Sequence, residues 1–481
     1  MRDVNVVGSG PNGLAAAVVF ARAGLSVQVT ERAGTAGGGL RTEELTLPGF
    51  RHDRCSAMHP AALASPFFRA FGLTTRVPFV IPEISYAHAL DGGRAAIAYR
   101  DLDRTSDRLG RDGPGWARLF QPLVNRLNGI VSFTGNQLLR WPDDPVAALR
   151  YGIDVLALGT VLGRVLLKPD AAALFAGVAA HAPGRQPSPA TAGAGLLLAA
   201  HGHARGWGYP VGGSQAIADA LVADFTAHGG SLRLGTEVRS IGDLEPARVT
   251  VLDTSPAFLA AFAGMTLPPG YRRALGRYRY GSGVAKVDFA LSGPVPWVNP
   301  EVALAPTVHL GGSREEVAAA ALSVAGGRVG EHPFVLVTQP SVLDDTRAPA
   351  GHHVLWAYTH VPPGSDTDMT ETIVRRIERF APGFRDTIVA SAGVSAKEMA
   401  EHDPNYVGGD ILGGKVTVGQ LIKRPVVSPR PWKTPVPGLY LCSASTPPGP
   451  AVHGMNGWYA ATVALRDEFG IAEPPSLAPD A

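Results

Sequence analysis

Hydrophobic residues near the amino terminus follow the pattern of a strand, a turn, a helix and a second strand. The short β-branched run at residues 4–7 (VNVV) predicts a buried parallel strand, and residues 25–30 (LSVQVT) predict a second strand. Between them, residues 11–24 (PNGLAAAVVFARAG) have helical composition and end on Gly24, which is typical of a helix C-terminus. The amino-terminal segment therefore predicts one compact β-α-β unit.

Patterns typical of helices and patterns typical of strands recur later in the chain. Apolar-periodic stretches predict helices at residues 144–167 and 170–182 and an amphipathic helix at 370–384. Alternating apolar and polar positions predict antiparallel strands at 283–291, 333–343 and 352–361. Near the end we expect a buried strand at 438–444, a turn-rich loop at 446–457 and a helix at 458–469.

The bulk composition narrows the class of protein. A chain of 481 residues exceeds the usual size of one core, so we expect two domains or one domain with large insertions. Apolar residues make up 45% of the chain, which argues against wholesale disorder. The net charge of +2, with interspersed signs, argues against a nucleic-acid partner.

Cellular location is predicted from what the sequence contains. No apolar window is long enough for a membrane-spanning helix, although contact of an apolar surface with a membrane stays open. Cys55 and Cys442 predict two buried thiols in a reducing cytoplasm, without a metal site or a disulfide. The turn at Gly8 leaves no room for a secretory signal, so we expect a cytoplasmic protein.

A glycine pattern follows the first strand. Gly8, Gly10 and Gly13 fit G-x-G-x-x-G, and the second strand closes with Glu31. Gly8 permits the tight turn, Gly10 lets backbone approach a pyrophosphate at the helix N-terminus, and Gly13 allows close helix-to-strand packing. Glu31 would accept hydrogen bonds from an adenosine ribose and repel a 2′-phosphate, which disfavours NADP. The unit therefore predicts a Rossmann-type dinucleotide-binding domain.

A second glycine cluster, Gly37 to Gly39, precedes Leu40 and Arg41. It would let backbone approach a second phosphate or a ribityl chain, with Arg41 supplying positive charge, and this favours FAD over NAD. The alternative interpretation is a flexible surface loop. No second strand, glycine turn, helix and acid occur together, so we expect no dedicated NAD(P) domain. Electrons would then pass to or from a diffusible partner, which could be oxygen, a quinone or NAD(P)H.

Three further segments resemble one family. Residues 43–73 (EELTLPGFRHDRCSAMHP and onward), 206–241 (GWGYPVGGSQAIADAL and onward) and 435–465 (PVPGLYLCSASTPPGPAVHGMNG and onward) resemble the phytoene desaturase and phytoene dehydrogenase-like oxidoreductases of the flavin amine oxidase superfamily. The resemblance covers nearly the whole chain. It implies an α/β fold, in which a Rossmann-type FAD-binding domain carries an inserted α+β substrate domain with an antiparallel sheet and a helical cap.

The same resemblance implies FAD contacts along the chain. The residues implied at the pyrophosphate are Gly8, Gly10, Pro11, Asn12 and Gly13; at the adenosine, Glu31, Arg32 and Val238; and at the ribityl chain, Gly38, Leu40 and Arg41. Those implied beneath the isoalloxazine ring are Ser443, Ala444, Ser445, Thr446, Val452, Gly454 and Met455. Val238 is expected on a strand at 235–241. Pro450 departs from relatives that carry a run of glycines there.

Pattern and resemblance together predict a discontinuous layout. The FAD-binding domain is expected in three parts, residues 1–75, 207–256 and 435–470. A helical cap at 76–206 and a substrate domain with the antiparallel sheet at 257–434 would lie between these parts. Residues 471–481 form a proline-rich tail that we expect to be frayed.

Two histidines are candidate catalytic residues. His59 follows the second glycine cluster, and His453 lies in the loop expected beneath the flavin ring. An imidazole there could give or take a proton near a reacting carbon or flavin N5. The alternative is that each histidine only orders its loop by hydrogen bonding.

Several other polar and aromatic residues are candidates for a pocket wall, a tunnel or a turn. Candidate walls of an apolar substrate pocket are Trp207, Tyr209, Trp458 and Tyr459, with core packing as the alternative. His181 and His201 would line a tunnel or lie in the core or on the surface. Asp344 and Asp345 are expected in a solvated turn. No metal-ligand spacing is present.

The leading functional prediction is an FAD-dependent oxidoreductase that desaturates or saturates C–C bonds of an apolar, polyene- or lipid-like substrate. Hydride would move to or from flavin N5. One alternative is a flavin-dependent double-bond isomerase without net redox turnover. Others are a flavin amine oxidase, for which no aromatic cage or ring-facing lysine motif is visible, and a flavin-free prenyl-binding escort protein.

Overall fold

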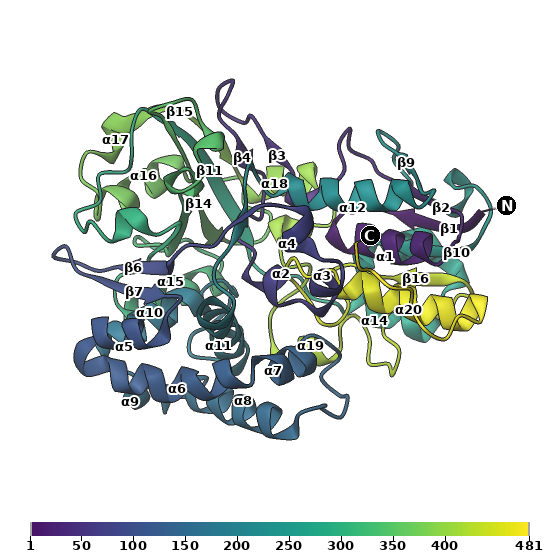
Figure 1. Cartoon of the computed structure of the whole chain (residues 1–481), viewed down its shortest axis with the longest axis horizontal. Helices are drawn as coiled ribbons and strands as arrows, with labels where there is room; N and C mark the ends of the chain where they lie inside the picture. Colours follow the sequence, from purple (N-terminus) through teal and green to yellow (C-terminus); the bar gives the residue numbers. More distant parts are fainter. Residues whose placement is uncertain (1, 480–481) are drawn as a thin grey trace.

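A computed structural model of the chain describes residues 2–479. Figure 1 shows two lobes. One lobe contains the first and last helices around a five-stranded sheet, and the other contains a seven-stranded sheet with helices packed against it. Within the described residues no helix combines the length and the apolar character needed to cross a membrane.

The Rossmann-type domain is built on a parallel sheet with the order β16–β10–β1–β2–β9. Its strands are β1 (Arg2–Val7), β2 (Val27–Thr30), β9 (Ser231–Arg233), β10 (Ala247–Leu252) and β16 (Leu439–Leu441). The main helices packed against it are α1 (Pro11–Arg22), α12 (Gln215–Ala227) and α20 (Met455–Phe469). All of these elements lie within residues 1–75, 207–256 and 435–470.

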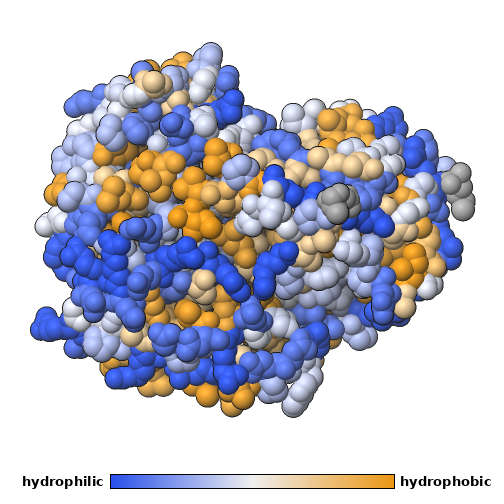
Figure 2. Space-filling model, in the orientation of Figure 1, coloured by the Kyte–Doolittle hydropathy of each residue, from blue (hydrophilic) through white to orange (hydrophobic). Residues whose placement is uncertain are grey.

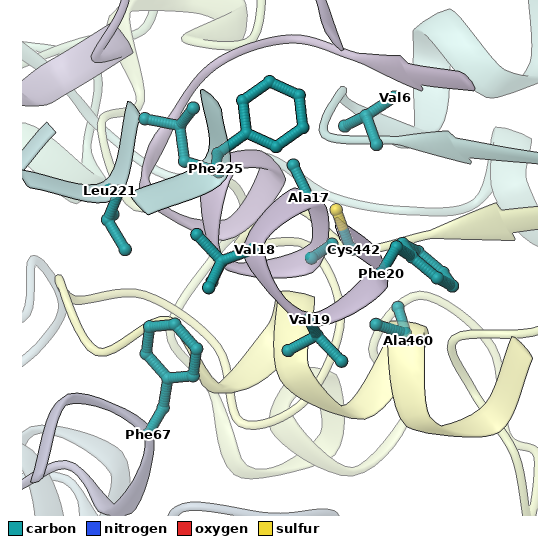
Figure 3. Packing of buried hydrophobic residues seen from close by; sticks show 14 of the residues in the cluster. Val6, Ala17, Val18, Val19, Phe20, Phe67, Leu221, Phe225, Cys442 and Ala460 are labelled. Atoms are coloured by element: carbon teal, nitrogen blue, oxygen red, sulfur yellow. The ribbon is translucent and has the colours of Figure 1, made fainter. Parts of the chain in front are cut away.

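Helix α1 is the centre of this domain. Figure 3 shows Val18 and Val19 of α1 packed among Leu221 and Phe225 of α12 and Ala460 of α20. Such burial stabilises the domain by about 25 cal/mol for each Å² of apolar surface removed from water. Since apolar residues face it from every side, α1 reads as a nearly continuous hydrophobic run in the sequence.

Glycines set how closely α1 approaches its neighbours. A Cβ added at Gly457 of α20 would lie 1.9 Å from the carbonyl oxygen of Asn12, and one at Gly13 would lie 2.3 Å from that of Gly8. Neither position tolerates a side chain without moving α1. The helix ends at Arg22 with Ala23 as its C-cap, and the predicted Gly24 follows directly, with φ +78° and its N–H donating to the Ala21 carbonyl.

The second sheet forms the substrate domain and has the order β15–β11–β14–β13–β12–β6–β7. Its strands are β6 (Ile84–Ala89), β7 (Ala95–Tyr99), β11 (Gly283–Leu291), β12 (Thr307–Leu310), β13 (Val335–Thr338), β14 (His353–Val361) and β15 (Ile388–Val394). All neighbours are antiparallel except β6 and β12, which are parallel. The predicted strands at 283–291 and 352–361 are confirmed as β11 and β14, and the one at 333–343 is confirmed over β13 only, since residues 340–342 form a short 3-10 helix.

Helices cover both faces of this sheet. The amphipathic helix α16 (Thr370–Glu378) packs on one face through Ile373 and Ile377. The other face carries helices of the cap, which are α5 (Leu102–Arg108), α6 (Gly113–Asn125), α7 (Leu127–Thr134), α8 (Pro145–Leu158), α9 (Gly163–Leu166), α10 (Pro169–Ala179) and α11 (Pro189–Ala204).

Shorter elements connect the two lobes and extend the loops. They include β3 (Thr42–Glu43), β4 (His52–Asp53), α2 (Pro60–Ala64), α3 (Pro66–Ala70), α4 (Leu73–Arg76), β5 (Phe79–Val80), β8 (Tyr209–Pro210), α13 (Pro256–Ala263), α14 (Pro269–Gly276), α15 (Arg314–Ala325), α17 (Phe384–Thr387), α18 (Ala396–His402) and α19 (Val418–Ile422).

The structure differs from the sequence predictions in several elements. The segment 76–206 contributes β6 and β7 to the substrate sheet in addition to its helices. The segment 144–167 is two helices, because the chain turns at Gly159. Residues 235–241 form no strand.

The proline-rich tail also differs from its prediction. Residues 471–479 lie against the Rossmann-type domain, where Leu477 is buried in its core and the Arg22 guanidinium donates to the Ser476 carbonyl. The prediction of a frayed tail is therefore wrong for these residues, while residues 480–481 lie outside the described part. Of the two free cysteines, Cys442 is buried as predicted, but Cys55 is only half-buried.

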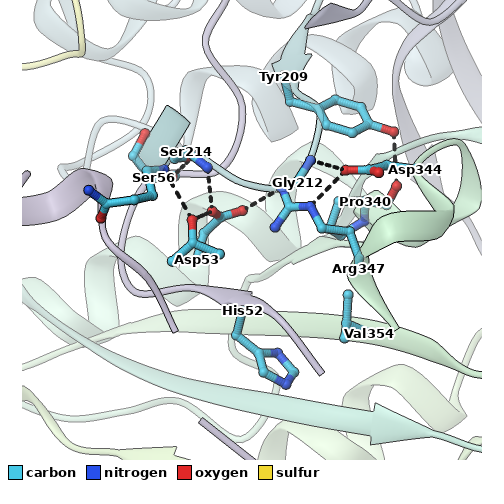
Figure 4. Close-up of polar contacts among 12 residues, drawn as sticks. His52, Asp53, Ser56, Tyr209, Gly212, Ser214, Pro340, Asp344, Arg347 and Val354 are labelled. Carbon is cyan, nitrogen blue, oxygen red and sulfur yellow. Dashed lines mark hydrogen bonds and ion pairs between the residues drawn. The ribbon is translucent and has the colours of Figure 1, made fainter. Parts of the chain in front are cut away.

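A buried ionic network joins segments of both domains (Figure 4). Arg347 donates through Nη2 to Asp53 at 3.0 Å and through Nε to Asp344 at 2.9 Å. The backbone N–H groups of Gly212 and Ser214 donate to Asp344 and Asp53, respectively, at 2.8 Å. Asp344 is therefore buried and paired, and the prediction of a solvated turn is wrong at this residue.

We predict that Arg347→Met destabilises the folded protein by about 3–5 kcal/mol, because it leaves two buried carboxylates without their cation. Urea unfolding of the purified protein measures this change. Arg385→Met removes an exposed guanidinium that pairs with Glu371 and should leave the unfolding midpoint nearly unchanged. Equal midpoints for the two variants would contradict the role given to the buried network.

Candidate functional site

A cavity of about 770 Å³ runs from the first glycine turn to the helical cap. It begins where the carboxyl ends of β1 and β10 meet, which is where ligands bind in open parallel sheets. It continues past β12 and β14 of the substrate sheet and ends between α8 and α11. Both domains therefore contribute walls to one continuous space.

The first glycine turn forms one end of this cavity. Gly8 has φ +96°, and a Cβ added at Gly10 would lie 2.6 Å from Asp253 Oδ2. The N-terminus of α1, with Gly10, Pro11 and Asn12, faces the cavity and has no capping side chain. Bare backbone at a helix N-terminus is the arrangement that binds a diphosphate.

Glu31 is held rigidly beside this turn. Its Oε2 accepts hydrogen bonds from the backbone N–H and the hydroxyl of Ser9 at 2.9 and 2.7 Å, and its Oε1 accepts from the Ala33 N–H at 2.8 Å. Arg32, which also lines the cavity, donates to backbone carbonyls of Glu401 and His402. The carboxylate is thus fixed at the wall of the cavity.

The second glycine cluster lies against the first. Gly38 has φ +55°, and a Cβ there would lie 3.1 Å from the Cα of Gly10. Arg41 is buried at the cavity wall, where its Nε donates to the Gly38 carbonyl and its Nη2 lies 2.9 Å from His402 Nε2. The cluster is an ordered part of the site, with a cation beside it, and the interpretation as a flexible surface loop does not apply.

Asp253 lies directly under the first glycine turn and accepts the Gly13 N–H at 2.9 Å. Burial raises the pKa of its carboxyl to about 7, against the lowering effect of that hydrogen bond. The group therefore carries less than a full negative charge near neutral pH, which limits its repulsion of a bound diphosphate. Sequence reasoning missed Asp253, although its place just after the buried strand β10 could have indicated it.

His453 lies at the start of α20 with its ring in the cavity wall. Its Nδ1 accepts the Met455 N–H at 3.1 Å, so the proton of a neutral ring is on Nε2. Burial lowers the pKa of His453 to about 4, which keeps the ring neutral at pH 7. Its Nε2 has no partner among the described residues. The Nε2–H of His453 is thus a buried donor in the cavity wall, and the nearby Gly449 backbone raises the pKa of the ring against the larger effect of burial.

Among the described residues, His59 leaves a hydrogen-bond acceptor without a partner, whereas His453 leaves a donor without one. Its Nε2 lies 2.8 Å from the hydroxyl of Ser214, which donates its only proton to the Ser56 carbonyl. The His59 Nε2–H must therefore be the donor, and Nδ1 is a bare acceptor without a partner in the described chain. Burial lowers its pKa to about 4 as well.

The far half of the cavity is apolar. Its walls include Met58, Val155, Leu197, Trp207, Leu336, Trp356 and Val416. The described residues that line this half come from 131–207 and from 307–421 without the loop 402–406. No Asp, Glu, Lys or Arg is among them. The charged lining residues, such as Glu31 and Arg41, lie at the glycine-turn end or in loop 402–406. The arrangement separates a polar, phosphate-binding half from a half suited to hydrocarbon.

Most of the predicted contact residues line this cavity. They are Gly8, Gly10, Pro11, Asn12, Glu31, Arg32, Gly38, Arg41, Val238, Ser443, Ala444, Ser445, Val452 and Met455. Gly13, Leu40, Thr446 and Gly454 lie behind the lining. Gly454 instead precedes the first residue of α20 as its N-cap. Its φ is +67°, and a Cβ there would collide with the Phe67 ring.

The four aromatic candidates for the walls of a substrate pocket lie in different environments. Trp207 lines the cavity and donates to the Thr307 hydroxyl at 3.0 Å. Tyr209 is buried outside the lining with its hydroxyl on the Pro340 carbonyl. Trp458 and Tyr459 pack on the core of the Rossmann-type domain and are not among the described residues that line the cavity. Sequence alone could not show which face of α20 is turned to the core.

Other cavity residues were not singled out as site residues from the sequence. His201, considered only for a tunnel or the core, lies in the wall with both ring nitrogens unpartnered, and burial lowers its pKa to about 4. Cys55, Asn405 and Tyr406 also line the cavity. These residues come from loops whose approach to the site depends on how the two domains meet.

The comparisons with known proteins agree with this geometry. The model of the family described as flavin containing amine oxidoreductase matches residues 12–455. The rat (Rattus norvegicus) pyridine nucleotide-disulfide oxidoreductase domain-containing protein 2 is 26% identical over 97% of this chain and 93% of its own length. One of the limonene dehydrogenase subunits of Castellaniella defragrans is 30% identical over 122 residues, which cover 25% of this chain and 22% of that protein.

Solved structures share the fold. Cyclohexylamine oxidase from Brevibacterium oxydans IH-35A superposes with a TM-score of 0.58 at 14% identity, over 98% of both chains. The predicted α/β class, with a Rossmann-type FAD-binding domain and an inserted α+β domain, is confirmed.

The residues present also fit FAD. Side-chain-free turns expose backbone at the phosphate-binding end, and the buried oxygens Asn12 Oδ1 and Thr254 Oγ1 have no protein partner among the described residues. The cavity is also long enough to pass from the Rossmann-type domain into the substrate domain. The family match extends from the start of α1 to the start of α20. The chain therefore belongs to the flavin containing amine oxidoreductase family, and its cofactor is FAD.

Proposed function

We propose that the protein desaturates or saturates C–C bonds of an apolar, polyene- or lipid-like substrate. The observation that carries this proposal is the uncharged far half of the cavity, walled by residues such as Val155, Leu197 and Leu336. The resemblance to phytoene desaturase-like enzymes supports it, as does the partial similarity to a protein named as part of a limonene dehydrogenase. A hydrocarbon leaves no buried charge unpaired in such a pocket.

FAD would be held by the two glycine turns, Glu31 and Arg41. When bound, it supplies a two-electron centre that accepts or donates a hydride at carbon. The chain's own residues bind the substrate, exclude water and orient it. Trp207 and Trp356 provide flat apolar walls, and the start of α20 directs its positive end toward this part of the cavity.

The histidines would act as neutral hydrogen-bonding groups. Both residues line the cavity where its two halves meet, and the buried His453 Nε2–H and His59 Nδ1 have no hydrogen-bond partner among the described residues, so each could bond a water or polar atom that enters beside it. A pKa of about 4 makes each ring a weak base at pH 7. Their contribution is therefore orientation and transient hydrogen bonding. Since desaturation removes one hydride and one proton from neighbouring carbons, the proton would pass to water.

Amine oxidation fits the cavity less well. No lysine lines it in the part of the chain that the structure describes. The buried Lys286 is behind the wall, where it is paired with Asp288 and its Nζ lies 5.3 Å from the centre of the Trp356 ring. With FAD as its cofactor, the chain also differs from a flavin-free escort protein.

Substrate class is tested by anaerobic flavin bleaching. We expect limonene or a linear polyene, delivered in detergent, to bleach the oxidised flavin and to yield a product lighter by two hydrogens. Putrescine and cyclohexylamine should leave the spectrum unchanged, because the far half offers no counter-charge for an ammonium. Bleaching by the amines alone would overturn the proposal. A product of unchanged mass, formed without an electron acceptor, would favour the isomerase.

The ribose contact is tested by Glu31→Arg. This change removes the acceptor of three hydrogen bonds beside the glycine turn, and we expect FAD occupancy of the purified protein to fall at least about tenfold. The absorbance ratio of flavin to protein measures occupancy. Glu31→Gln keeps an acceptor and should lose less, and Glu44→Arg, at an exposed position, should retain FAD. Full occupancy in Glu31→Arg would show that the assignment is mistaken.

The neutral state of the histidines is tested by pH. The folded pKa of His453 lies below the ordinary 6.5, so stability is complete above pH 6.5 and falls as the pH drops toward 4. The loss for one such histidine is at most on the order of 3 kcal/mol. His453→Asn should therefore show a shallower decline of the urea midpoint over this range than the parent. Parallel declines would contradict burial of a neutral ring.

A further inference from the structure

Helix α8 (Pro145–Leu158) is apolar on two opposite sides. On its inner side Tyr151 and Val155 line the cavity. On its outer side Val146, Leu149, Ile153 and Leu156 are between 53% and 66% exposed. Spacings of three and four residues place these four side chains on one helical face. A soluble helix normally turns polar residues outward, so this outer face needs an explanation.

The exposed apolar surface extends beyond α8. Of the 21 exposed large hydrophobic residues in the described chain, ten lie between Leu139 and Leu166. Trp141 before α8 and Val165 in α9 are the most exposed of these ten, at 81% and 80%. We call these ten residues the outer face. Figure 2 shows apolar residues along the lower edge of the molecule, where Figure 1 places α8 and α9. Clustered exposed hydrophobic residues usually mark a contact surface.

The charges around the outer face are unbalanced. Residues 126–168 contain five cations and three carboxylates. Each carboxylate forms an ion pair with an arginine of the same segment. The pairs are Arg126–Asp144, Arg140–Asp143 and Arg150–Asp154. Arg164 and Lys168 are exposed and supply the excess positive charge. A positive excess beside exposed apolar side chains complements anionic lipid headgroups.

The same charge argues against a second copy of the chain as the occupant. In a symmetric dimer each face would meet an identical face, so the excess cations would be brought together. Trp141 adds to the preference for lipid, because tryptophan is enriched at the membrane–water interface.

The outer face is also joined to the cavity. Gly135, Asn136 and Leu138 line the cavity, and the next residue, Leu139, is exposed on the outer face. Helix α8 is therefore the partition between the apolar half of the cavity and the outer face. An apolar compound leaving a bilayer would meet the cavity beside this helix.

We propose that the outer face docks the protein on the surface of a lipid bilayer, with Arg164 and Lys168 near anionic headgroups. The attachment is interfacial, through side chains of α8, α9 and the preceding loop. That the bilayer also delivers the substrate rests on the proposed function; the docking itself does not.

Vesicle sedimentation of the oxidised, FAD-containing protein, without substrate, tests the docking. We expect binding to phosphatidylcholine vesicles that contain phosphatidylglycerol and weaker binding to phosphatidylcholine alone. The triple change Leu149→Gln, Ile153→Gln and Leu156→Gln should lower the partition coefficient at least about tenfold, because it removes most of the apolar stripe. The double change Arg164→Glu and Lys168→Glu should lower binding mainly to the anionic vesicles.

The matched control is Ile241→Gln with Met265→Gln, two exposed apolar residues outside the outer face, which should bind as the parent does. Flavin absorbance and the urea midpoint show whether each variant is folded. Absence of binding to both vesicle types, or equal binding by the triple variant, would overturn the proposal. So would a dimeric parent that becomes monomeric in the triple variant and never binds lipid. Bleaching by amines would refute the proposed substrate class and leave these results untouched.

Discussion

The close approach of bare backbone at the first glycine turn is the constraint on which the rest of the structure depends. Gly8, Gly10 and Gly13 bring the start of α1 against the end of β10, at distances that no Cβ would permit. Gly457 then lets α20 lie directly on α1. Because α20 begins at Met455, directly after His453 in the cavity wall, this packing also sets where the third part of the Rossmann-type domain meets the cavity. One steric condition thus positions both the phosphate-binding end and the start of α20 in the cavity wall.

The cavity joins two environments with different electrostatics. At the glycine turns, Arg41 supplies positive charge and the raised pKa of Asp253 limits negative charge, which suits a diphosphate. In the far half the lining is uncharged, and the imidazoles of His59 and His453 stay neutral because burial lowers their pKa. A charged intermediate would find no counter-ion there, so a hydride and the proton of the neighbouring carbon would have to leave in nearly the same step, and the protein's part is to position the substrate and control the access of water.

The buried Arg347 network holds the two domains together behind the cavity wall, and helix α8 closes the cavity at its far end. Arg347 ties Asp53 of the Rossmann-type domain to Asp344 of the substrate domain, and its partner Asp53 also holds the Ser214 backbone, whose hydroxyl orients His59. Domain contact and histidine tautomer are therefore linked through one carboxylate. At the other end, α8 closes the apolar half with one face and presents the outer face with the other.

Local sequence determined the β-α-β unit, the role of Gly24, the long strands β11 and β14 and the choice of FAD, because each depends on neighbouring residues or on a short fixed spacing. It also indicated most of the residues that line the cofactor end. Tertiary structure alone decided that β6 and β7 join the substrate sheet, that Asp344 is buried against Arg347, that Trp458 and Tyr459 face the core, and that Asp253 lies under the glycine turn. Each of these outcomes depends on which distant segment packs against a residue, and the periodicity of a single segment carries no record of its partner.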